Sequence, residues 1–98
     1  MSVSIVPESA IRRALGAEPA ALDAIAEAFV ALSSGRVSMP PVIRVDIHAA
    51  GGEVDVKTAY IKGLDSFAIK IASGFPGNSA RGLPSGSGMM VLMSAETG

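Results

Sequence analysis

The spacing of apolar residues changes once along this chain, and that change limits what the chain can fold into. In the first third, apolar residues recur at three- and four-residue steps, as on the buried side of a helix. They are Ile11, Leu15, Leu22, Ile25, Phe29 and Leu32. From Val42 the period is two, which indicates half-buried strands. Met39-Pro40-Pro41 lies between the two patterns and disfavours helix. The sequence therefore predicts an α+β fold, with two N-terminal helices followed by an antiparallel β-meander.

Proline and glycine mark the ends of the predicted helices. Pro7 and Pro19 lie where a first helical turn tolerates a missing N–H. Gly16 divides the two segments, and Gly35 lies where a left-handed residue would end the second one. We therefore expect one helix on either side of Gly16.

Turn signals divide the second part of the chain into strands. The predicted strands cover residues 43–48, 53–57 and 67–72. Gly51-Gly52 marks the first turn and Lys62–Asp65 the second. Residues 74–88 contain five glycines and are expected to form a loop that closes over a site or a subunit boundary. The apolar run Met89–Met93 is expected to be a buried strand.

Composition excludes several classes of protein. At 98 residues the chain is one small domain, too short for separate dinucleotide-binding and substrate-binding halves. Eight basic against nine acidic side chains, with no basic block, argue against nucleic acid as a partner. The chain has no cysteine and only one histidine, which argues against a metal site. No apolar run is long enough to cross a membrane. Since the start lacks the features of a secretory signal, we expect a cytoplasmic protein.

The chain is also more apolar than a lone small domain needs to be. Its mean hydropathy is +0.46. A small domain buries only about two thirds of its surface, so a chain this apolar leaves apolar side chains exposed when it folds alone. The sequence stops at Gly98, directly after the last predicted strand. We therefore expect a fragment with a partner surface, which a second copy or a missing domain would cover.

The second turn predicts a pair of like charges. A turn centred on Gly63-Leu64 places Lys57 opposite Lys70, so two ammonium groups lie side by side on one face. Like charges directly opposite are destabilising unless an anion or nearby carboxylates offset them. Ala68 and Ala72 flank Lys70 on the same face and are small enough to leave a recess.

The first turn leaves two registers open. A four-residue loop over 49–52 places Arg44 opposite Lys57, so that three cations converge, and this register favours an anion site. A turn with Gly51-Gly52 at its centre instead places Asp46 opposite Lys57. This second register gives ordinary cross-strand ion pairs on a solvated face.

Other residues that could carry chemistry have weaker support. Residues 74–88 lack the spacing of a phosphate-binding loop, and Ser85 and Ser87 have no base at a fixed spacing. His48 could be a general base, although a lone histidine beside a turn is more often solvated. Met89, Met90 and Met93 are interpreted as core or interface residues. No residue of this chain is therefore predicted to be catalytic.

Several ordered motifs resemble one protein family. They are Met39-Pro40-Pro41 with Arg44, Lys57-Thr58-Ala59-Tyr60, Phe67-Ala68-Ile69-Lys70, Gly74-Phe75-Pro76-Gly77-Asn78, Gly82-Leu83-Pro84-Ser85 and Ser94-Ala95-Glu96-Thr97-Gly98. In this order they resemble the amino-terminal part of the ornithine cyclodeaminase and mu-crystallin family, especially members linked to ectoine utilization. The resemblance runs from the first helix to the last residue.

The resemblance implies that residues 1–98 are the N-terminal part of a substrate-binding and dimerisation domain. In such a family the parent enzyme has a further Rossmann domain that binds NAD or NADP, and no cofactor is expected on this fragment. The expected partners are a small amino or imino acid and a second copy in a homodimer or larger oligomer. Arg44 and Lys70 match the positions that hold the α-carboxylate of the substrate. The family's general acid/base aspartate lies beyond position 98.

Lys57 departs from the motif of many relatives, which have an apolar residue there. An additional cation beside the carboxylate site suits a dicarboxylic amino or imino acid better than it suits ornithine. Two alternatives remain open. The first is a non-catalytic module of the mu-crystallin type that holds a small anion on the same face. The second is a structural fragment that associates with itself through the strand Met89–Met93.

Overall fold

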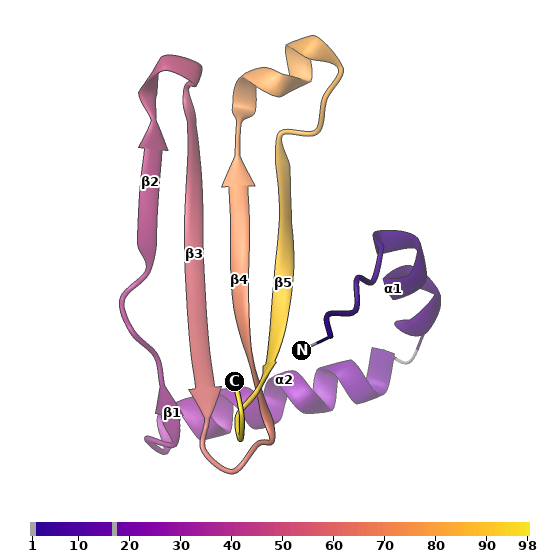
Figure 1. The fold of residues 1–98 in the computed structure, drawn as a ribbon, viewed down its shortest axis with the longest axis vertical. Helices are drawn as coiled ribbons and strands as arrows, with labels where there is room; N and C mark the ends of the chain where they lie inside the picture. Colours follow the sequence, from indigo (N-terminus) through magenta and orange to yellow (C-terminus); the bar gives the residue numbers. More distant parts are fainter. Residues whose placement is uncertain (1, 17) are drawn as a thin grey trace. The chain divides into compact units, whose positions relative to one another are not determined.

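A computed structural model describes residues 2–16 and 18–98 of the chain (Figure 1). It contains two compact units, Met1–Ser34 and Gly35–Gly98. The helices are α1 (Glu8–Ala14) and α2 (Glu18–Ser33), and the strands are β1 (Val37–Ser38), β2 (Ile43–Ile47), β3 (Gly52–Ile61), β4 (Ser66–Gly74) and β5 (Gly86–Ser94). Short 3₁₀-helices cover His48–Ala50 and Pro76–Arg81. The predicted order of two helices followed by an antiparallel sheet is confirmed.

Proline and glycine limit the helices as their local chemistry requires. Pro7 is the N-cap of α1, and Pro19 is the second residue of α2. Gly35 follows α2 with a φ of 76°, a left-handed conformation that glycine adopts without strain. Among the described residues only Ala31 is buried, so both units expose much of their apolar surface. No helix in the described part of the chain has the length and apolar character needed to cross a membrane.

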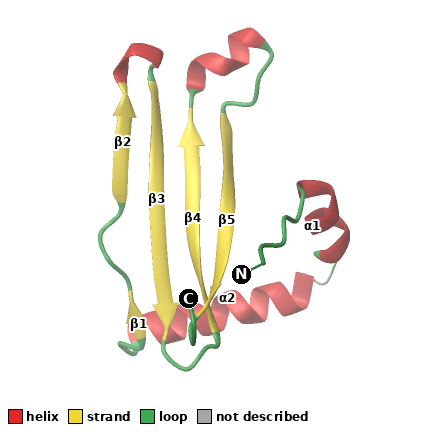
Figure 2. Cartoon of the chain, viewed as in Figure 1, coloured by secondary structure: helices red, strands yellow, loops and turns green. Residues whose placement is uncertain are grey.

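The second unit is a single antiparallel sheet (Figure 2). Strands β3, β4 and β5 pair in sequence order, as a meander requires. Strands β1 and β2 both pair with β3, β1 near its C-terminal end and β2 near its N-terminal end. The sheet therefore has β5 at one edge and β1 with β2 at the other.

The predicted loop over 74–88 is shorter than expected. Gly74 belongs to β4, and Gly86 and Gly88 belong to β5, where they pair with Gly74 and Ala72. A Cβ at position 88 would overlap the backbone oxygen of Ile71, so glycine in this segment permits close strand pairing and does not signal a loop. The actual connection is closed by a hydrogen bond from the amide of Phe75 to the carbonyl oxygen of Ser85 (2.7 Å).

The apolar strand near the C-terminus is not buried in this chain. Met89, Met90 and Leu92 are 60, 62 and 75 % exposed. The prediction of a buried strand is wrong because β5 is an edge strand, with no further strand beside it among the described residues. An exposed apolar edge of this kind is a surface for pairing.

Candidate functional site

The two lysines lie opposite each other as predicted. Strands β3 and β4 pair Lys57 with Lys70 and Ala59 with Ala68. The short turn sets this register, and Gly63 takes a φ of 98° within it. Both lysines are exposed. Two ammonium groups therefore project side by side from the middle of the sheet.

The first turn adopts neither of the two predicted registers. Ile47 pairs with Gly52, so the connection is residues 48–51 and begins one residue earlier than in the four-residue alternative. Its first three residues form a 3₁₀ turn, and Gly51 closes it with a φ of 62°. Arg44 consequently lies opposite Asp55, neither of the predicted partners of Lys57 is correct, and the direct convergence of three cations is wrong.

Arg44, Lys57 and Lys70 nevertheless share one face of the sheet. Residues directly opposite each other share a face, as do residues two apart on one strand. Arg44 faces Asp55, Asp55 precedes Lys57 by two positions, and Lys57 faces Lys70. Arg44 is thus a diagonal neighbour of Lys57, one row further along the sheet.

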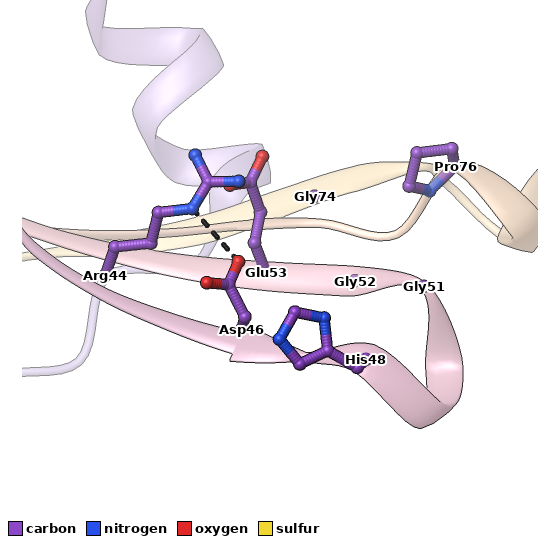
Figure 3. Close-up of a pocket in the computed structure, with 8 residues that line it drawn as sticks. All are labelled: Arg44, Asp46, His48, Gly51, Gly52, Glu53, Gly74 and Pro76. Atoms are coloured by element: carbon purple, nitrogen blue, oxygen red, sulfur yellow. Dashed lines mark hydrogen bonds and ion pairs between the residues drawn. The ribbon is translucent and has the colours of Figure 1, made fainter.

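Two carboxylates hold the guanidinium of Arg44 (Figure 3). Its Nε donates to Oδ1 of Asp46 at 3.1 Å, and its Nη2 forms an ion pair with Oε2 of Glu53. The hydrogen bond with Asp46, and next the charge of Glu53, raise the pKa of Arg44 above its ordinary value. Arg44 is therefore a fixed cation with its charge largely offset.

The acidic and basic pairs on this face differ in how they are neutralised. Asp46 and Glu53 lie directly opposite each other, and Arg44 bridges them. For Lys57 and Lys70 no carboxylate within ion-pair distance is recorded in the described ranges. Since like charges in a cross-strand pair are destabilising, the lysine pair is the place on this face where an external anion gains most.

An open pocket of about 350 Å³ lies at the end of the sheet beside Arg44. It is lined by Arg44, Asp46, His48, Gly51, Gly52, Glu53, Gly74 and Pro76. His48 reaches it from the 3₁₀ turn and lies next to Asp46 in Figure 3. Lys57 and Lys70 are not among its lining residues. The pocket therefore lies beside Asp46 and Glu53 and not beside the lysine pair.

Asp55 is a candidate that sequence reasoning did not select. It lies between Arg44 and Ala72 on neighbouring strands, two residues before Lys57. Its Oδ1 is screened from solvent and accepts no recorded hydrogen bond within the described residues. A carboxylate oxygen in this state can accept a hydrogen bond from a cationic nitrogen. No sequence signal marked it, because its place opposite Arg44 depends on the 3₁₀ turn between β2 and β3.

Comparison with known proteins identifies the family. Residues 5–98 match the ornithine cyclodeaminase/mu-crystallin family. The chain belongs to this family. A protein of Rhizobium meliloti named as a dehydrogenase is 49 % identical over 96 residues, which cover 98 % of this chain and 29 % of that protein.

Two solved structures of archaeal proteins share the fold. A Δ1-pyrroline-2-carboxylate reductase of Thermococcus litoralis, in complex with NADH and L-proline, matches with a TM-score of 0.70 and 26 % identity, over 74 % of this chain and 22 % of the reductase. An archaeal alanine dehydrogenase dimer with bound NAD matches with a TM-score of 0.77 and 29 % identity, over 88 % of this chain and 26 % of the dehydrogenase. The chain thus spans less than a third of the length of the relatives named here.

The residues described here do not fit a nicotinamide dinucleotide. A Rossmann-type site needs parallel strands joined by a helix, with a glycine-rich turn at the helix N-terminus. The strand pairs of this sheet are antiparallel, and its glycine-rich segment lies in a β-hairpin. No residue of this chain is therefore assigned to such a cofactor.

Proposed function

We propose that these residues form the substrate-binding and dimerisation part of an NAD(P)-dependent enzyme that acts on an amino or imino acid. The observation that carries the proposal is the Lys57–Lys70 pair, which lies on the same face as Arg44 and has no carboxylate partner among residues 2–16 and 18–98. The names of the relatives support it, since those proteins act on or bind amino acids with NAD or NADH. The dinucleotide would bind to residues outside this chain.

Each charged residue has a distinct proposed role. Lys70 and Arg44 bind the α-carboxylate, which positions the acid and lowers the entropic part of the barrier. Lys57 binds a second carboxylate, so the preferred substrate is dicarboxylic. Asp55 accepts a hydrogen bond from the nitrogen of the acid, because its Oδ1 lacks a recorded partner within the described residues. None of these residues transfers the hydride, which NAD(P)H supplies when bound.

A second copy of the protein is the proposed partner of the sheet. Met89, Met90 and Leu92 are exposed on an edge strand, and the matching archaeal alanine dehydrogenase is a dimer. Covering these side chains would remove an apolar surface that a lone chain leaves in water.

Initial rates of the full-length protein test the proposal. NAD(P)H absorbance is followed with L-proline, L-alanine, L-ornithine and L-glutamate, which differ in the charge of their side chains. We expect Lys70→Ala to raise KM and lower kcat together, and Lys57→Met to reduce the preference for L-glutamate over L-proline. Lys62→Met, an exposed lysine of the β3–β4 turn, is the matched control. Unchanged kinetics in Lys70→Ala would remove the lysine pair from the site.

A further inference from the structure

Arg44 is held in a geometry that leaves one edge of its guanidinium free. A guanidinium has five N–H donors, one on Nε and two on each terminal nitrogen. Asp46 occupies the Nε donor and Glu53 occupies Nη2. Figure 3 shows the other terminal nitrogen directed away from both carboxylates. In the part of the chain that the structure describes, no acceptor is recorded on Nη1.

The carboxylates of Asp46 and Glu53 lie close together and need the charge of Arg44 between them. Asp46 is two residues from Arg44 on β2, and Glu53 lies directly opposite Asp46 on β3. Without a cation between them, this pair would be a destabilising like-charge contact. Both carboxylates also line the pocket beside Arg44, so the group they hold is at the edge of an open space.

The side chain of Arg44 would otherwise be mobile. It is 57 % exposed, while Asp46 and Glu53 are 44 and 34 % exposed. Ordering a long exposed side chain at the moment of binding costs affinity, and a side chain that is already ordered avoids that cost. At these exposures the two ion pairs contribute little to folding stability. Their main effect is to orient the guanidinium of Arg44.

We infer that Asp46 and Glu53 are positioning residues, which hold Arg44 so that its Nη1 edge is presented to the carboxylate of the substrate. This inference rests on the proposed function, because it assumes that Arg44 binds the acid. Asp46 and Glu53 do not contact the substrate in this account. They act only through Arg44.

A double-mutant cycle in the full-length protein tests the inference. Binding of L-proline and of L-glutamate is measured by calorimetry for Glu53→Gln and Asp46→Asn, each with Arg44 present and with Arg44→Gln. With Arg44 present, each variant should weaken binding by about threefold to tenfold, the effect of leaving one long side chain to be ordered. With Arg44→Gln, the same changes should have no effect, since there is no guanidinium to position. Glu96→Gln, an exposed carboxylate outside the site, is the control.

The outcomes separate this inference from the proposed function. If Arg44→Gln weakens binding but Glu53→Gln and Asp46→Asn do not, the inference fails and the proposed function stands. Equal losses in both backgrounds indicate a structural role, and tighter binding indicates that the carboxylates block Arg44. Either result overturns the inference. If Arg44→Gln binds like the unmodified protein, or neither acid binds, both fail. Should Glu53→Gln not fold, Asp46→Asn carries the test, because it removes only the contact at Nε.

Discussion

Glycine residues of β5 control how closely this strand approaches β4. A Cβ at position 88 would overlap the backbone oxygen of Ile71, which cannot move without disturbing the strand pairing. At position 86 the nearest atom to an added Cβ is the backbone oxygen of Ser73 at 3.7 Å, an ordinary contact. The two glycines lie on the same strand and differ in the space around them.

Gly88→Ala should therefore destabilise the protein much more than Gly86→Ala. Relieving the overlap requires a local shift of β5, which typically costs about 1–3 kcal/mol. Thermal unfolding of the two full-length variants measures the difference, and Gly86→Ala serves as the matched control. A melting temperature for Gly88→Ala equal to that of the control would contradict this prediction, because it would show that β5 shifts away from β4 with no loss of stability.

At the scale of elements, the pairing of β3 with β4 forces two cations together. The pair remains because the rest of the sheet fixes the register, although like charges directly opposite cost free energy. An anion that binds there would remove this cost. The lysine pair thus lowers the stability of the ligand-free sheet, and the proposed ligand offsets this loss.

Lys57→Gln should consequently stabilise the ligand-free protein at low ionic strength. The expected gain is about 0.2–1 kcal/mol, and it should disappear at high salt, which screens exposed charges. The melting temperature of the full-length variant, at low and high sodium chloride, measures it. Lys62→Gln, which removes an exposed turn lysine, should show no such gain. A loss of stability in Lys57→Gln at low salt would mean that this lysine already has a favourable partner.

The two turns explain why only part of the site was predictable. The turn between β3 and β4 is short and contains a glycine with positive φ, so counting from Gly63 gave the Lys57–Lys70 pair correctly. The turn between β2 and β3 contains a 3₁₀ segment that hydrophobic alternation does not reveal. The opposition of Arg44 and Asp55 could therefore not be obtained from the sequence, and neither could the contacts of Arg44 with Asp46 and Glu53.

At the scale of the whole molecule, the apolar strand β5 is exposed at the edge of the sheet, where a partner can pair with it. The helices and the order of the strands were predictable, because hydrophobic period and turn residues are local. The exposure of β5 was not, because an apolar run has the same sequence whether its own chain or a partner covers it. Twenty large apolar side chains are exposed among the described residues, Leu92 at 75 %.

Leu92→Lys should weaken self-association of the full-length protein, because a lysine on an edge strand opposes pairing. Sedimentation velocity measures the change, and we expect the dissociation constant of the proposed dimer to rise by about tenfold or more. Leu64→Lys, at an exposed position in the β3–β4 turn, is the control. A dimer unaffected by Leu92→Lys would place the interface elsewhere.

A structure of the full-length protein with bound NAD and an amino acid substrate is the measurement that tests this account most directly. We predict the α-carboxylate within hydrogen-bond distance of Nζ of Lys70 and of Nη1 of Arg44, with Lys57 directed at any second carboxylate. A substrate carboxylate held by other side chains, with both lysines in solvent, would contradict the account.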